Sequence, residues 1–188
     1  YLCGAAITRG CVKVTKIIPE HIASTLDAFR EMGCKVDVGN AWAQVDARGL
    51  ELKPISISTL PFPGFPTDMQ APLMATLVSV PGNSLIQDTV YNDRCKHVAE
   101  LQRMGANIQV NGNTATIKGG TKLEGTEIMG SDLRATAALV LAALVAEGES
   151  TVSRVYHLDR GYEDFENKMA KIGGVVIRHS DDEDDDAF

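Results

Sequence analysis

The chain has 188 residues, of which 44% are hydrophobic, so it is long and apolar enough to bury a sizeable core. Its formal net charge of −7 predicts no general affinity for nucleic acid or for an anionic membrane, and local cations must hold any anionic ligand. Four cysteines without metal-like spacing, and no apolar run near the roughly 20 residues of a membrane helix, indicate a cytoplasmic protein without disulfides, zinc or a membrane span.

The predicted elements recur in three segments, which cover about residues 1–50, 51–122 and 123–180. In each segment a small apolar helix stops at a glycine, a β-like run follows, and an amphipathic helix stops at a second glycine. These glycine pairs are 23, 23 and 25 residues apart: Gly10 and Gly33, Gly82 and Gly105, Gly148 and Gly173. Because one order of elements appears at nearly one spacing, we interpret the chain as three copies of one unit.

A full unit is predicted to contain a strand, a helix, a strand, a helix and two final strands. Extended segments at 52–59 and 123–130 precede the second and third apolar helices, and the turn "VNGNT" at 110–114 closes a terminal hairpin. The third unit ends with one expected strand, "VVIR" at 175–178, which has no partner strand in the chain.

The two helices of a unit differ in their apolar surface. In "HVAELQRMG" the apolar Val98, Leu101 and Met104 recur every three residues, which predicts a surface helix. The first helix is apolar nearly all round, as in "LVLAALVAEG", so it must be enclosed by other elements. We therefore expect an α/β (α+β) fold in which a threefold βαβαββ repeat places buried helices inside and sheets outside.

The two ends of the sequence suggest one domain of a larger protein. The first apolar helix has no start of its own, and the third unit lacks its last strand, so we expect sequence elsewhere to complete a domain at 1–180. The stretch 181–188 opens with six consecutive acids, which predicts a solvated, disordered tail.

A hydroxyl residue and an aspartate open both the second and the third apolar helix. Thr67 and Ser131 are expected to be N-caps, which places Asp68 and Asp132 in the first turn, where the helix dipole favours a carboxylate. This placement has a purely structural explanation, because caps and first-turn acids stabilise a helix without any further role.

Arginines at repeated positions suggest that the two aspartates also have a functional role. Arg94 and Arg160 each lie 12 residues after a helix-stop glycine, and Arg134 lies two residues after Asp132. Equivalent positions of repeated units project toward the same end of a domain, so we predict a charged cluster between the second and third units. An arginine binds phosphate or carboxylate through its bidentate fork, and a carboxylate beside it can orient or deprotonate a hydroxyl.

Four stretches resemble successive signature blocks of the UDP-N-acetylglucosamine 1-carboxyvinyltransferase family: "FPGFPTDMQAPLMA", "DTVYNDRCKHVAELQRMGA", "GSDLRATAALVLAALVAEG" and "YHLDRGYEDFENKMAKIGG". The resemblance extends from residue 1 to about residue 178. It implies an enolpyruvyl transferase that begins peptidoglycan synthesis and has two domains, each an inside-out α/β barrel of three repeats. The substrates lie between the domains, and this chain is similar to most of the second one.

The resemblance also implies a reaction, in which the enolpyruvyl group of phosphoenolpyruvate moves to the 3-hydroxyl of UDP-N-acetylglucosamine and phosphate leaves. Asp68 resembles the aspartate that binds this hydroxyl and acts as its base, and Asp132 resembles a second aspartate implicated in proton handling at the enolpyruvyl carbon. The implied catalytic residues are Asp68, Asp132 and Arg160, and the implied substrate-binding residues are Asp68, Val90, Arg94, Arg134 and Arg160. No cofactor or metal is implied, and the expected partners are the two substrates and the first domain.

Two alternatives remain open. The sister family, 3-phosphoshikimate 1-carboxyvinyltransferase, shares the implied fold and reaction, although "PTDMQA" and "HLDRGYE" favour the UDP-sugar enzyme. The other alternative is a non-catalytic anion-binding module, half of a once-complete enzyme, and a reading frame that extends upstream into the missing domain would argue against it. The family's reactive cysteine, the target of fosfomycin, lies on a loop that matches nothing in this chain.

Overall fold

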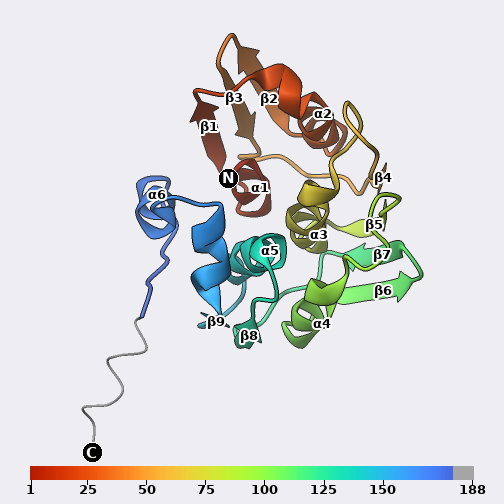
Figure 1. The fold of residues 1–188 in the computed structure, drawn as a ribbon, viewed down its shortest axis with the longest axis vertical. Helices are drawn as coiled ribbons and strands as arrows, with labels where there is room; N and C mark the ends of the chain where they lie inside the picture. The colour runs from red at the N-terminus through yellow and green to blue at the C-terminus, as the bar shows by residue number, and fades with distance from the viewer. Residues whose placement is uncertain (180–188) are drawn as a thin grey trace, which may run out of the picture.

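The computed structural model describes residues 1–179, and within them three small β-sheets surround three central helices (Figure 1). The central helices are α1 (Leu2–Ile7), α3 (Gln70–Val78) and α5 (Leu133–Ala143), and each of them contacts the other two. Every residue of α1 and α3 is buried, as is the stretch 135–142 of α5. The all-round apolar surface of these helices is therefore explained by neighbours on every side.

The first part of the chain folds into an antiparallel sheet in the order β1-β3-β2 beside α1. Its hairpin joins β2 to β3, and Asp46 at the end of β3 pairs with Cys11 on one side and Lys35 on the other. Its remaining elements are β1 (Cys11–Thr15), the 3-10 helix η1 (Pro19–Ile22), α2 (Ala23–Glu31), β2 (Lys35–Gly39) and β3 (Trp42–Asp46).

The middle part forms a four-stranded sheet in the order β4-β5-β7-β6, with β4 and β5 parallel and the other pairs antiparallel. Its element order agrees with the predicted unit, and the hairpin turns at Gly112, whose φ is +59°. Besides α3, its elements are β4 (Ser56–Ser58), the 3-10 helix η2 (Thr67–Met69), β5 (Gly82–Gln87), α4 (Lys96–Arg103), β6 (Asn107–Asn111) and β7 (Thr114–Gly119).

The last part has a short parallel pair, β8 with β9, beside α5. The expected strand at 175–178 is wrong, because the described chain runs there without a ladder partner and leaves Val175 85% and Ile177 73% exposed. The remaining elements are β8 (Glu127–Met129), β9 (Thr151–Ser153), the 3-10 helix η3 (Val155–Arg160) and α6 (Phe165–Lys171). The predicted acidic tail at 181–188 lies outside the described residues.

Small residues allow the sheets and helices to approach closely at one point. Gly119, the last residue of β7, lies against the end of α3, and a methyl group there would overlap the carbonyl oxygens of Leu77 and Val80. The surface helix α4 instead buries Val98 and Leu101 on one face, as its periodicity predicted.

No helix in the described part of the chain is long and apolar enough to cross a bilayer.

Candidate functional site

The starts of the two longer central helices lie close together, and the structure corrects the predicted caps there. Asp132, not Ser131, is the N-cap of α5, because its side chain accepts hydrogen bonds from the backbone N–H groups of Arg134 (2.9 Å) and Ala135 (3.0 Å). Thr67 caps no helix through its side chain, since the 3-10 helix η2 precedes α3. Sequence could not distinguish these cases, because either residue of a Ser-Asp pair is a good cap.

Asp68 is held between two arginines that come from different parts of the chain. Its Oδ1 lies 2.8 Å from Nη1 of Arg94 and 2.6 Å from Nε of Arg134. The side chain of Arg94 is 19% exposed and that of Asp68 is 57% exposed, so the carboxylate faces solvent while the guanidinium of Arg94 is largely covered. The hydrogen bond from Arg134 holds the pKa of Asp68 below its usual value; partial burial opposes this effect, and Arg94 reinforces it.

The carboxyl group of Asp132 is also kept ionised. Partial burial alone would raise its pKa, but the N–H groups of Ala135 and Arg134 donate to it and the net effect lowers the pKa. The helix dipole at the start of α5 favours the same charged form. Arg134 therefore donates to two carboxylates, to Asp132 from its backbone N–H and to Asp68 from its guanidinium.

Two other predicted residues lie near this cluster without joining it. Arg160 ends η3, and the next residue, Gly161, packs against Leu133 at the start of α5. Arg160 is exposed and forms no ion pair or side-chain hydrogen bond among residues 1–179. Val90 is 42% exposed in the turn after β5. The structure thus brings together Asp68, Arg94 and Arg134, with Asp132 at the base of the cluster.

Tyr91 adds an aromatic contact to the cluster of Asp68, Arg94 and Arg134. Its ring lies under the guanidinium of Arg94, with 4.5 Å from Cζ to the ring centroid, and the ring is half exposed. Such a contact favours the cationic group by about 0.5–1 kcal/mol at an exposed position. The guanidinium of Arg94 is therefore held by both the Tyr91 ring and the carboxylate of Asp68.

Sequence reasoning missed Asp88, a carboxylate that is only 2% exposed. It accepts hydrogen bonds from the hydroxyls of Thr59 and Thr67, each at 2.7 Å, and from the N–H groups of Val90 and Tyr91. Burial raises the pKa of Asp88, and these four hydrogen bonds lower it below its usual value. The only sequence signal was an aspartate directly after a strand, which is common at turns.

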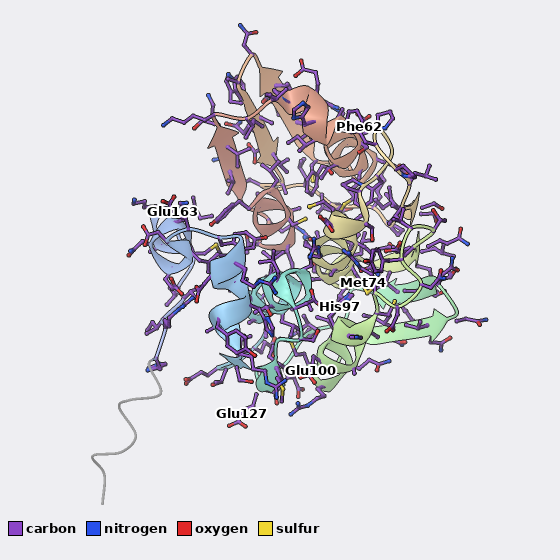
Figure 2. The ribbon with its side chains drawn as sticks, viewed as in Figure 1. Phe62, Met74, His97, Glu100, Glu127 and Glu163 are labelled. Atoms are coloured by element: carbon purple, nitrogen blue, oxygen red, sulfur yellow. The ribbon has the colours of Figure 1, made fainter. Side chains whose placement is uncertain are left out.

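Sequence reasoning also missed His97, which lies at the start of α4 where this helix faces the central helices (Figure 2). The imidazole is 2% exposed, and its Nε2 has no hydrogen-bond partner among the described residues. Burial lowers the pKa of His97 to about 4, although the charge of Asp132 and a backbone hydrogen bond to Arg94 oppose the shift. His97 is therefore neutral beneath a site that is otherwise rich in charge.

The arrangement suits acid–base chemistry on an anionic molecule. Two guanidinium groups supply bidentate donors for phosphate or carboxylate, and two ionised carboxylates stand beside them as proton acceptors. Within residues 1–179 no group of three or more metal-ligating side chains is assembled. The chemistry that these residues can perform is anion binding together with proton transfer.

Comparison with known proteins places the chain in a family. Residues 1–169 match the family model for EPSP synthase (3-phosphoshikimate 1-carboxyvinyltransferase). A protein of Acinetobacter baylyi named UDP-N-acetylglucosamine 1-carboxyvinyltransferase is 50% identical over 96% of this chain and 43% of its own length. A protein of the same name from Coxiella burnetii is 45% identical over 96% of this chain and 42% of its own length. The chain spans less than half the length of these curated relatives.

Solved structures give the same picture of the fold. The enolpyruvyl transferase NikO from Streptomyces tendae matches 95% of this chain and 42% of its own, with a TM-score of 0.85 and 27% sequence identity. EPSP synthase from Acinetobacter baumannii matches 96% of this chain and 43% of its own, with a TM-score of 0.67 and 20% identity, a likeness of fold alone. The chain therefore belongs to the EPSP synthase (3-phosphoshikimate 1-carboxyvinyltransferase) family.

Proposed function

We propose that this chain supplies one side of the active site of a UDP-N-acetylglucosamine 1-carboxyvinyltransferase. The enzyme transfers the enolpyruvyl group of phosphoenolpyruvate to the 3-hydroxyl of UDP-N-acetylglucosamine and releases phosphate, the first committed step of peptidoglycan synthesis. The observation that carries the proposal is the carboxylate of Asp68 held at 2.8 Å and 2.6 Å by Arg94 and Arg134. The relatives that bear this enzyme's name support the choice of substrates.

Each member of the cluster has a role in the proposed reaction. Asp68 binds the acceptor hydroxyl and removes its proton. Its second oxygen, Oδ2, accepts no hydrogen bond within the described chain and is available for that step. Arg94 and Arg134 bind the anionic groups of phosphoenolpyruvate and stabilise the charge of the tetrahedral intermediate. An arriving anion competes with Asp68 for these arginines, which weakens the two hydrogen bonds that lower its pKa and makes it a stronger base.

The remaining predicted residues complete the proposal. Asp132 handles the proton at the enolpyruvyl carbon, Arg160 approaches the phosphoenolpyruvate side from η3, and Val90 lines the UDP-sugar site. Arg160 forms no ion pair among the described residues, so its side chain must turn toward Asp68, Arg94 and Arg134 when the anionic substrate binds.

The fold organisation belongs to the same proposal. We infer a threefold repeat with boundaries near 1–50, 51–122 and 123–180, arranged as an inside-out α/β barrel with α1, α3 and α5 as corresponding helices. The chain covers 43% of a relative's length, so the other wall of the cleft is expected from a further domain of the whole enzyme. We place that enzyme in the cytoplasm, where thiols such as the four free cysteines of this chain stay reduced.

The matching family model favours a second candidate, transfer to 3-phosphoshikimate. A competition assay on the complete protein, with both acceptors present at equal concentration, separates the two. Phosphate release that depends on UDP-N-acetylglucosamine supports the proposal, and release that depends on 3-phosphoshikimate replaces it. If neither acceptor supports turnover but the protein still binds phosphate, the result favours the non-catalytic anion-binding module.

The direct test of the proposal is Asp68→Asn in the complete protein. Asparagine keeps the shape of the side chain but cannot accept the proton, and loss of a general base costs about 10²–10⁴-fold in rate. Asp46→Asn is the matched control, because Asp46 also forms an ion pair, at 2.7 Å with Arg48, at the end of β3 in the first sheet. We expect kcat to fall only in Asp68→Asn, and a value within about threefold of the parent would reduce Asp68 to a structural role.

A further inference from the structure

Asp88 is a buried carboxylate whose partners are all neutral. Burying an ionised carboxylate is costly unless hydrogen bonds replace its water shell. Here four donors do so, and none of them is a cation: two threonine hydroxyls at 2.7 Å and two backbone N–H groups at 3.0 and 2.8 Å. No arginine or lysine forms an ion pair with Asp88 within residues 1–179. The carboxylate of Asp88 therefore holds the four groups that donate to it in fixed positions.

The donors to Asp88 connect it to the charged cluster in two ways. The first is Thr67, whose hydroxyl donates to Oδ2 of Asp88 and whose carbonyl accepts from Nη1 of Arg94 at 3.5 Å. Thr67 also precedes Asp68 directly in the chain. Any shift of Thr67 therefore moves both partners of the Asp68–Arg94 ion pair.

The second connection is the turn after β5. The N–H groups of Val90 and Tyr91 donate to Oδ1 of Asp88, which fixes the turn that carries the ring beneath Arg94. The remaining donor, Thr59, directly follows β4 and exchanges hydrogen bonds with Thr89. Thr59 therefore reaches the cluster only through the turn at 89–91, whereas Thr67 adjoins both partners of the Asp68–Arg94 ion pair.

We infer that Asp88 is a positioning residue for the proposed reaction, and this inference rests on the proposed function of Asp68. Its carboxylate fixes Thr67 and the 90–91 turn, and through them the distance between the base and the arginine that binds the anion. Catalysis is sensitive to such distances, since a displacement of about 1 Å in a reacting group can cost about 10²-fold in rate.

The experiment compares Thr67→Val with Thr59→Val in the complete protein. Each variant deletes one hydroxyl that donates to Asp88 at 2.7 Å, and each keeps a branched side chain of the same size. Thr59→Val should lower the melting temperature at least as much as Thr67→Val, because the buried Thr59 hydroxyl also accepts the N–H of Thr89. We nevertheless expect at least about a tenfold fall in kcat for Thr67→Val and less than about threefold for Thr59→Val, whose hydroxyl supports only the turn. Thr67→Ser, which restores the hydroxyl, should recover kcat. Equal losses of kcat in the two valine variants, or no recovery with serine, would overturn the inference.

A second readout does not depend on the reaction. In the 188-residue chain, carbon-13 NMR follows the titration of the Asp68 carboxyl group, whose pKa is lowered by Arg134 and Arg94. We expect its pKa to rise toward the usual value in Thr67→Val and to stay at the parent value in Thr59→Val. An unchanged pKa in Thr67→Val overturns the positioning role, whereas a complete protein without transferase activity overturns only the proposed function.

Discussion

The neutral His97 should make the stability of the fold depend on pH in a range where carboxylates contribute little. In the unfolded chain a histidine has a pKa of about 6.5, and burial lowers that of His97 to about 4 in the folded chain. Between these two values the unfolded state binds a proton that the folded state does not bind. Stability is therefore complete above about pH 6.5 and is lost as the pH falls toward the folded pKa.

The size of this effect follows from the two pKa values. Each pH unit between them changes the free energy of unfolding by about 1.36 kcal/mol. Lowering the pH from about 7 to about 5 crosses roughly 1.5 units of that range, so the fold should lose about 2 kcal/mol. For a domain of this length, such a loss lowers the melting temperature by about 4–8 °C.

The assay is thermal or urea unfolding of the 188-residue chain at a series of pH values, with His97→Asn as the control. Asparagine can still donate to the carbonyl of Arg94 but does not titrate, so the variant should lack this part of the pH dependence even if it is less stable overall. Asp68, Asp88 and Asp132 do not interfere, because their lowered pKa values place their losses of stability below about pH 4. An unchanged pH profile in His97→Asn would refute the reasoning.

The other predictions concern a cap and a close contact. Asp132→Ala should lower the free energy of unfolding by about 1 kcal/mol, and Asp132→Ser should recover most of this loss because serine is a good N-cap. If Asp132→Ser also keeps the turnover of the complete protein, Asp132 has no role in proton transfer. Gly119→Ala should cost about 3 kcal/mol because its methyl group meets the carbonyls at the end of α3. Gly112→Ala, in a turn with open space, should cost about 1 kcal/mol; equal costs in urea unfolding would contradict this packing argument.

The helices and most strands were predictable because their signals are local. The all-round apolar runs and the three-residue spacing in α4 identify buried and surface helices without knowledge of the rest of the fold. The strand at 175–178 was predicted wrongly, although its sequence, VVIR, is as apolar as those of the strands that do form. A strand exists only where a second backbone satisfies its hydrogen bonds, and a single sequence does not say which backbone that is.

The candidate site was predictable in part for the same reason. Asp68, Arg94 and Arg134 could be expected near one another because repeated spacing implies repeated placement, while their roles stay predictions. Asp88 and His97 carried no such signal, since each is a single polar residue whose burial depends on segments far away in the chain. The exact cap of α5 was missed because Ser131 and Asp132 are chemically equivalent candidates for it.

The enclosed position of α1, α3 and α5 limits how sequences with this fold can diverge. Helices α3 and α5 contact each other, and both contain alanines with no exposed surface, among them Ala75, Ala138 and Ala142. A larger side chain there would force the helices apart and disturb both helix starts, where Asp68 and Asp132 stand. Substitutions that preserve this fold are therefore expected in the outer sheets and surface helices, while the buried alanine positions of the central helices should accept only other small residues.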